Sequence, residues 1–303
     1  NVNNLTASVY TTDDTDYRFP IWQSSKAWDG RKNFYSGDAR KPKSYLLTNT
    51  VWDGRDSKGN PLEDGHYTYV VRYTPDVPGA EEQTVSFDLQ IDTQKPQITS
   101  GYITNKDGVE TLTVRKPKDV GNGGILREQV FYLKADEEGS ITYKDVDSHG
   151  KEREYEHRVY LSANEDGTYT LPEGVDKSQI FYAVEDYAGN KDVLALSEFV
   201  SSENSGRIRV SMVDATTHKD VDTTFVYRIK DDKGKYVDLD KGKDINFLPF
   251  GRYTVEVFTY DRDEIKFYGS KTQEFELTAQ DSFKTIEFLV KEVVFAPVSV
   301  SFD

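Results

Sequence analysis

The chain has 303 residues, no cysteine and a formal net charge of −15 at pH 7. The lack of cysteine excludes disulfides, thiolate metal sites and a cysteine nucleophile. The acidic balance argues against binding to nucleic acid or to an anionic membrane surface. No run of about 18 apolar residues occurs, so we expect no membrane insertion. Aromatic residues make up 13% of the chain, which is more than disordered chains carry, so the composition indicates small folded domains with aromatic cores.

The first residues lack an initiator methionine and a signal-peptide pattern, so we expect a piece of a longer protein. The acidic run that follows, Asp13-Asp14-Thr15-Asp16, could bind calcium, because hard cations prefer clustered carboxylates. The run lacks the glycine and the closing glutamate of an EF-hand loop. A solvated acidic loop is therefore the favoured interpretation.

A turn-rich segment over residues 22–43 carries the candidate contact residues. Its aromatic rings either pack in a core or between domains, or they contact a carbohydrate or a protein, and packing is the favoured interpretation. Basic side chains gather beside these rings in an otherwise acidic chain, and such a local reversal of charge could steer an acidic partner. The predicted partner-contact residues are Trp22, Trp28, Arg31, Lys32 and Tyr35.

A tetrapeptide, Gly-x-Tyr-Thr, occurs three times, starting at Gly65, Gly167 and Gly251. Alternating runs follow the first and third copies, and period-two alternation is typical of a half-buried β-strand. A glycine ahead of such a strand suits a turn that needs positive φ. The repeat therefore predicts several small β-domains in tandem.

Two joints divide the chain. A strand predicted over residues 85–91 is followed by Lys95-Pro96, where the proline removes a ladder donor and favours extended geometry before it. A polar, flexible run over residues 201–206 precedes a new strand over residues 207–213. Helical periodicity is scarce, and short strands with turn signals between them predict an all-β chain. We predict tandem Ig- or fibronectin-III-like β-sandwich domains over residues 1–95, 96–202 and 203–303.

Two motifs carry a resemblance to a known family. The first is Val51-Trp52-Asp53-Gly54-Arg55-Asp56 with its continuation to Asp64-Gly65-His66-Tyr67-Thr68 and on to Lys95-Pro96. The second is Asp186-Tyr187-Ala188-Gly189-Asn190, which is similar to the ending of bacterial surface Ig-like domains. Over residues 45–200 the chain resembles the fibronectin-III-like domains that follow the protease unit in Gram-positive (streptococcal and lactococcal) cell-envelope subtilisin-like serine proteases. The residues themselves indicate turns, with Trp52 closing one end of a sandwich.

The resemblance implies a serine protease as parent, but its activity cannot be assigned to residues of this chain. The Gly-Thr-Ser-Met-Ala motif of that family is absent, and the single methionine, Met212, lies in a predicted strand. No His-Glu-x-x-His signature occurs. The four histidines lie in turn-like or polar surroundings, and we expect them to be solvated: His66, His149, His157 and His218.

Two further features could bind a ligand. The Gly121-Asn122-Gly123-Gly124 loop lacks the preceding strand and following helix that a phosphate-binding loop needs. Asp92, Asp186 and Asn190, near the predicted joints, could hold calcium and stiffen a linker, but a metal-free joint is the favoured interpretation. We predict no catalytic residue, no cofactor and no metal site.

We therefore predict a non-catalytic stalk of a cell-wall-anchored protease. It would act as a spacer and as an exosite for protein substrates. The alternative is an adhesin or a carbohydrate-binding module of a bacterial surface protein. The predicted partners are a protein substrate of the parent or a host surface protein, the predicted location is extracellular at the cell wall, and the predicted state is monomeric.

Overall fold

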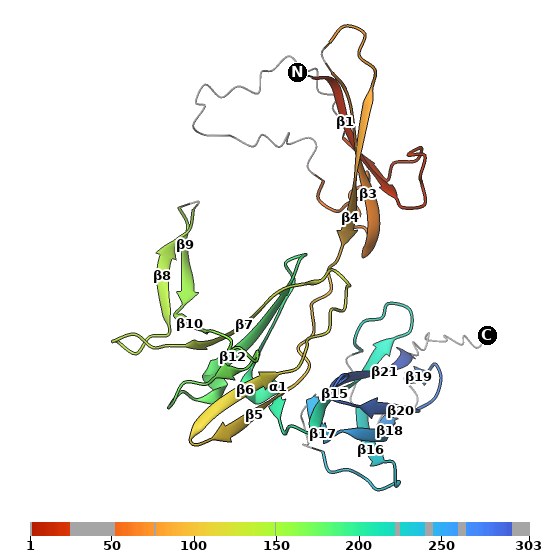
Figure 1. Cartoon of the computed structure of the whole chain (residues 1–303). Coiled ribbons are helices and arrows are strands. Elements are labelled where there is room, and N and C mark those ends of the chain that lie inside the picture. Colours follow the sequence, from red (N-terminus) through yellow and green to blue (C-terminus); the bar gives the residue numbers. More distant parts are fainter. Residues whose placement is uncertain are drawn as a thin grey trace, which may run out of the picture. The chain divides into compact units, whose positions relative to one another are not determined.

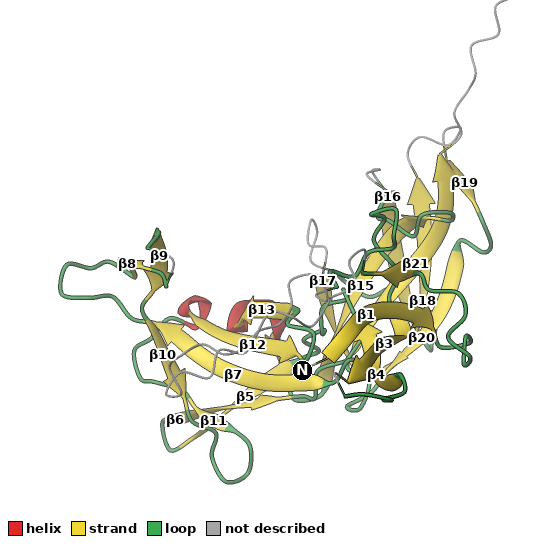
Figure 2. Ribbon diagram, turned by 90° about the horizontal axis from the view of Figure 1, so that it is seen from above, coloured by secondary structure: helices red, strands yellow, loops and turns green. Residues whose placement is uncertain are grey.

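The computed structural model describes residues 2–24, 52–75, 77–148, 150–221, 225–239, 245–259 and 265–292. Almost all of the regular structure in these residues is β-strand (Figure 1). The helical elements are one turn each, η1 (Lys177–Gln179) and α1 (Leu196–Phe199), which lie beside β13 in Figure 2. The prediction of an all-β chain of tandem sandwiches is confirmed.

The chain folds into two compact units. The first unit contains residues 1–95 with two short loops, 119–124 and 186–190, and the second contains the remainder. The three-domain division at residues 95 and 202 stays a prediction. The second unit contains two pairs of sheets, one on each side of residue 202.

The first unit contains an antiparallel sheet in the order β2-β1-β3-β4. Its strands are β1 (Val2–Thr11), β2 (Trp22–Gln23), β3 (Gly65–Pro75) and β4 (Gln83–Ile91). The predicted strands are present, with Tyr67 and Tyr69 of β3 opposite Leu89 and Phe87 of β4. The buried face is the other one, because Thr68 and Val70 are buried while Tyr67 and Tyr69 are half-buried and Phe87 is 53% exposed. Gly65 opens β3 at φ +156°, a value that residues with a Cβ rarely adopt.

The middle segment forms a two-layer sandwich with sheets in the orders β10-β7-β12-β13 and β11-β6-β5-β14. The first sheet contains β7 (Ile125–Leu133), β10 (Arg158–Leu161), β12 (Ile180–Asp186) and β13 (Lys191–Ala195). The second contains β5 (Gly101–Lys106), β6 (Val109–Val114), β11 (Tyr169–Thr170) and β14 (Val200–Ser201). Buried apolar side chains fill the core, among them Ile98, Leu112, Val130, Tyr182 and Phe199.

A hairpin is inserted between β7 and β10 of this sandwich. It consists of β8 (Thr142–Val146) and β9 (Glu152–Glu156), which pair only with each other among the described strands. Both views show the hairpin extending beyond the sandwich sheets (Figures 1 and 2). A two-stranded hairpin is marginally stable by itself in water, so its base must be anchored. The His157 amide donates to the Ile141 carbonyl at 2.8 Å, and the Lys134 amide donates to the His157 carbonyl at 2.9 Å.

The last segment is a second sandwich, with sheets in the orders β17-β15-β21-β19 and β16-β18-β20. The strands of the first sheet are β15 (Ser205–Asp214), β17 (Ile245–Pro249), β19 (Ile265–Phe267) and β21 (Phe283–Glu292). Those of the second are β16 (Phe225–Asp231), β18 (Gly251–Thr259) and β20 (Thr272–Leu277). β15 pairs with β21 in parallel, which brings residues about 75 positions apart into one ladder. Met212, which the sequence places in a strand, is buried in this core.

Arg207 joins the two sandwiches of the second unit. Its side chain is almost fully buried, and Nη1 donates to the carbonyls of Ile98 and Thr99, both at 2.9 Å. The guanidinium lies over the Phe283 ring, 4.7 Å from its centroid. Burial lowers the pKa of Arg207 to about 10, so the side chain remains protonated at neutral pH. A buried charge needs acceptors, and here the neighbouring sandwich supplies them.

Tyr182 offers a test of the middle core. Its ring is fully buried, its hydroxyl donates to a Glu128 carboxylate oxygen, and burial raises its pKa. We expect Tyr182→Phe to lower the free energy of unfolding by about 1 kcal/mol, because one charge-assisted hydrogen bond is lost while the exposed Glu128 can turn to water. Denaturant titration followed by far-UV circular dichroism measures this loss. The half-exposed Tyr160 is the control, and an equal loss in Tyr160→Phe would contradict the assignment.

Candidate interaction surface

The structure describes one of the five side chains predicted to contact a partner. Trp22 lies in β2 opposite Val9 of β1 and is half-buried. The other four lie outside the described residues: Trp28, Arg31, Lys32 and Tyr35. The contact cluster therefore stays a prediction.

The motif around Trp52 is a set of turns, as predicted. The indole Nε1 donates to the Arg55 carbonyl at 2.7 Å, and the ring meets the Tyr67 ring edge-on with centroids 6.1 Å apart. Asp56 Oδ1 accepts from the amides of Lys58 and Asn60 at 2.9 and 2.8 Å. These bonds satisfy the backbone of the turn, so the motif serves the fold.

The acidic run at Asp13–Asp16 also serves the local backbone. The Asp14 carboxylate accepts from the amides of Arg18 and Phe19 at 3.0 and 2.6 Å, and these bonds lower the pKa of Asp14. Asp16 forms an ion pair with Arg18 at 2.8 Å. Within the described part of the chain, no group of three or more His, Asp and Glu side chains is placed to hold a metal ion.

The second calcium candidate is a joint held by the protein's own groups. Asn190 Nδ2 donates to an Asp186 carboxylate oxygen at 2.9 Å and to the Asp92 carbonyl at 3.0 Å. The Gly121 loop packs tightly on the Asp92 carboxylate, because a Cβ on Gly121 would lie 1.9 Å from Oδ1. Gln90 Nε2 donates to the Gly121 carbonyl at 2.8 Å. The glycine-rich loop thus receives a carboxylate of the protein instead of a phosphate.

The histidine prediction holds for two residues and needs one correction. His66 and His218 are exposed, as expected, and His149 lies outside the described residues. His157 was predicted to be solvated, but it is half-buried, with its ring centroid 4.7 Å from that of Tyr143 and Nε2 3.9 Å from Asp136 Oδ2. Tyr143 of the neighbouring strand covers part of the His157 ring, a contact between distant residues that the local sequence does not show.

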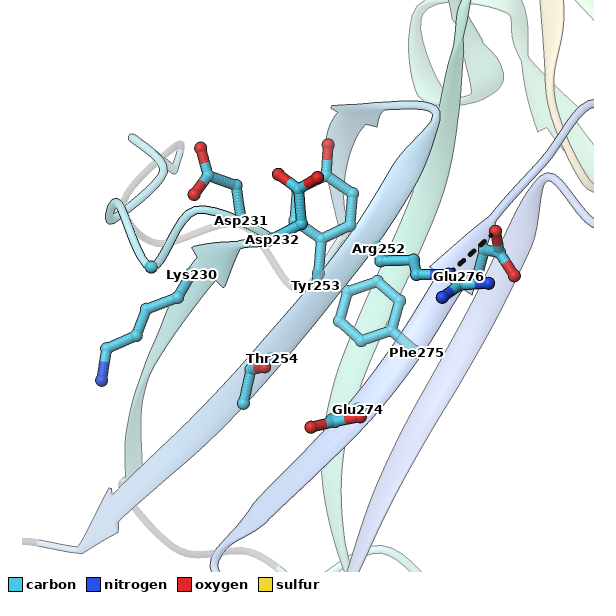
Figure 3. Close-up of a pocket in the computed structure, with 10 residues that line it drawn as sticks. Lys230, Asp231, Asp232, Arg252, Tyr253, Thr254, Glu274, Phe275 and Glu276 are labelled. Carbon is cyan, nitrogen blue, oxygen red and sulfur yellow. Dashed lines mark hydrogen bonds and ion pairs between the residues drawn. The ribbon is translucent and has the colours of Figure 1, made fainter.

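A hollow of about 600 Å³ lies on the β16-β18-β20 sheet (Figure 3). Both cations of its lining are paired: Arg252 Nε lies 3.4 Å from Glu276 Oε1, and Lys230 Nζ lies 3.5 Å from Oε2 of Glu256, outside the lining. Tyr253 stacks on Phe275 with centroids 5.5 Å apart. The lining carries four carboxylates, Asp231, Asp232, Glu274 and Glu276, against the two cations Lys230 and Arg252, so this hollow is an acidic sheet face.

A second hollow, of about 500 Å³, is lined mainly by aromatic rings at the base of the hairpin. Tyr143 and Tyr155 stack across the β8–β9 pair with centroids 5.6 Å apart, and His157 continues the row beside Tyr143. Arg158 forms an ion pair with Glu156 at 2.7 Å and lies over the Phe131 ring. We call this the aromatic hollow, and its lining residues are Tyr143, Tyr155, Glu156, His157, Arg158 and Tyr160.

The aromatic hollow continues along the outer face of the sheet. A further hollow of about 350 Å³ shares Arg158 and Tyr160 with it and runs over β7, β12 and β13. In the hollow over β7, β12 and β13, Arg127 and Lys191 both form ion pairs with Glu185. Sequence reasoning missed this surface. The available signal was the pair of tyrosines, Tyr143 and Tyr155, on either side of the turn that contains Gly150.

Fold and surface together define a chain of Ig-like β-sandwiches that carries an aromatic surface, and the comparisons with known proteins give its relatives. No known protein-family pattern matches the chain. The chain is 34% identical over 201 residues to C5a peptidase of Streptococcus pyogenes, a match that covers 63% of this chain and 15% of the relative. C5a peptidase of the M3 serotype is 32% identical over 200 residues, with the same coverage. The resemblance to C-terminal domains of a cell-envelope protease is confirmed, and the chain spans about 15% of the length of these curated relatives.

Solved structures show only a distant likeness. The major pilin subunit BcpA of Bacillus cereus is 10% identical, with 95% of each chain covered and a TM-score of 0.21. The Bacillus anthracis TIE protein is 11% identical, with 96% of this chain and 52% of that chain covered and a TM-score of 0.21. Among the described residues, no helix has the length and hydrophobicity needed to cross a bilayer.

Proposed function

We propose that this chain is part of the accessory region of a cell-wall-associated, extracellular subtilisin-like serine protease. It carries no catalytic residue, acts as a monomeric spacer, and provides an exosite for the protein substrate of the parent or for a host surface protein. The observation that carries the proposal is the identity of 34% over 201 residues to C5a peptidase. The three predicted domains, 1–95, 96–202 and 203–303, are the units of this spacer.

The joint between the last two predicted domains supports a spacer role. The Arg207 contacts tie these two sandwiches, both in the second unit, through buried hydrogen bonds. A tied joint limits relative motion of the segments, which a spacer needs if it is to hold a catalytic unit at a set distance. The exposed aromatic hollow supports the exosite role, because Tyr and Arg are enriched in interaction hot spots.

The test compares kcat/KM of the parent protease with and without the 303-residue region, on a folded protein substrate and on a short peptide spanning the cleavage site. We expect the deletion to lower kcat/KM about tenfold for the protein substrate and to leave the peptide unchanged, because remote binding energy is lost only for the large substrate. A parent carrying an unrelated tandem sandwich of equal length is the control that separates spacing from binding. Unchanged rates on both substrates would overturn the exosite role.

A further inference from the structure

We infer that the outer face of the β10-β7-β12-β13 sheet is a docking surface for an acidic, extended segment of a protein partner. The surface is the hollow of about 350 Å³ described above, and we call it the basic hollow. This inference rests on the proposed exosite, because on the parent enzyme the acidic segment would belong to the protein substrate or the host surface protein. The lining residues that carry the argument are Arg127, Arg158, Tyr160, Glu185, Lys191 and Val193.

Three strands bring cations to this one face of the sheet. Arg127 comes from β7, Arg158 from β10 and Lys191 from β13. The alternate residues of neighbouring strand positions, such as Val130 and Tyr182, point the other way and fill the core. The cations therefore serve no contact inside the sandwich, and they lie where a partner can reach them.

The charge of the basic hollow is opposite to that of the whole chain. Its lining carries three cations against one carboxylate, Glu185, which gives a net charge of +2 in a chain of net charge −15. Counting Glu156, which pairs with Arg158 from the neighbouring aromatic hollow, still leaves +1.

The exposed part of this charge is positive as well. Arg127 and Lys191 share Glu185, and their side chains are 52% and 55% exposed, whereas that of Glu185 is only 15% exposed. One carboxylate cannot neutralise two cations. A partner that approaches this face therefore meets the two cations before it meets the carboxylate.

Apolar side chains share the hollow with the cations. Tyr160 is 52% exposed and Val193 is 42% exposed, and Val193 lies opposite Ala183 in register. Apolar area of this kind stays in water until a partner covers it. An occupant with carboxylates for the cations and carbon groups for Tyr160 and Val193 matches both properties, since a guanidinium can bind a carboxylate through two parallel hydrogen bonds.

A protein segment fits this lining better than a sugar does. Sugar hydroxyls need acceptors as well as donors, and the single carboxylate of the lining is already held by two cations. An extended segment places every second side chain on one side. Carboxylates at alternate positions can thus all face the sheet.

The test measures the fluorescence anisotropy of a short labelled peptide of alternating glutamate and glycine, titrated with the full 303-residue chain. The net charge of −15 repels this peptide, so its binding must come from a local surface. We expect Arg127→Gln/Lys191→Gln to raise Kd about tenfold, because two charge contacts are lost. The matched control is Lys230→Gln/Arg252→Gln in the hollow of Figure 3, which changes the net charge equally and should retain wild-type Kd. An equal rise of Kd in the control would overturn the inference.

A gain of binding provides a second readout, which a misfolded variant cannot imitate. Glu185→Gln removes the carboxylate that competes for Arg127 and Lys191, so it should lower Kd about threefold. Glu276→Gln, at the ion pair with Arg252, makes the same change in net charge and should leave Kd unchanged. No gain in Glu185→Gln, equally tight binding of a serine–glycine peptide, or tighter binding of a sulfated oligosaccharide of equal charge would contradict the inference.

Kinetics on the parent enzyme separates this inference from the proposed function. If Arg127→Gln/Lys191→Gln abolishes peptide binding but leaves kcat/KM for the protein substrate unchanged, the surface is real and the exosite role fails. If deletion of the region slows cleavage of the protein substrate while the glutamate–glycine peptide never binds, the proposed function stands and this inference fails.

Discussion

Replacing Arg207 by alanine is expected to lower the free energy of unfolding of the second unit by about 4 kcal/mol. Two carbonyls, of Ile98 and Thr99, lose their donor in a buried setting, which costs about 1–3 kcal/mol for each orphaned group. The vacated volume adds a cavity term. Burying the Arg207 guanidinium costs free energy, as the lowered pKa of this side chain indicates. Its removal therefore offsets part of the loss.

The readout can be resolved by unit. All three tryptophans, Trp22, Trp28 and Trp52, precede residue 95, so tryptophan fluorescence follows the first part of the chain, while far-UV circular dichroism follows all sheets. We expect Arg207→Ala to lower the denaturation midpoint seen by dichroism and to leave the tryptophan transition in place. The control is Arg209→Ala, two residues along β15, whose exposed ion pair with Asp220 is worth less than about 1 kcal/mol.

An intermediate loss in Arg207→Met would separate volume from hydrogen bonding, since methionine fills space without donating. A loss below about 1 kcal/mol in Arg207→Ala would contradict the assignment, because the carbonyls would then have found other donors.

Gly121→Ala is expected to lower the free energy of unfolding of the first unit by about 2–3 kcal/mol. The new methyl group would lie 1.9 Å from Asp92 Oδ1, and Asp92 is buried with only 8% of its surface exposed. The carboxylate is held by the Gln94 amide at 2.9 Å, so it cannot swing aside freely. The tryptophan transition should therefore move to lower denaturant concentration.

A double-mutant cycle with Asp92→Ala tests the cause. Removal of the carboxylate leaves room for the methyl group, so Gly121→Ala should cost less than about 1 kcal/mol in the Asp92→Ala background. Equal costs in both backgrounds would show that the loop backbone, and not the carboxylate, rejects the side chain.

Several parts of the architecture could be predicted because their causes are local. The alternation of Tyr253, Val255 and Val257 in β18 and the turns after Trp52 depend on neighbouring residues, and the structure places them as expected. In β3 the strand is as predicted, but Thr68 and Val70 are buried in place of the tyrosines. The Asp186–Asn190 turn is likewise confirmed, with the Asn190 amide donating to Asp186 Oδ1 at 2.8 Å.

The contacts between distant residues could not be predicted. The sequence predicts Arg207 to be a solvent-facing residue of an alternating strand. In the structure it is buried and donates to the carbonyls of Ile98 and Thr99, more than a hundred positions away. The Gly121 loop carries a glycine pattern whose purpose appears only when Asp92 packs on it. The sequence pattern points to a contact at residues 22–35, while nothing local to Tyr143 or Tyr160 shows that their rings are exposed side by side with other rings.

The sequence by itself determined the all-β class, the turn motifs and the relationship to cell-envelope proteases, because periodicity, turn chemistry and motif identity are properties of contiguous residues. The tertiary structure alone decided which side chains meet: the buried Arg207, the glycine loop on Asp92 and the aromatic hollow. The physical reason is that strand pairing brings together residues far apart in the chain. The local sequence around a single Tyr, Arg or Gly therefore does not show whether that residue is solvated or buried.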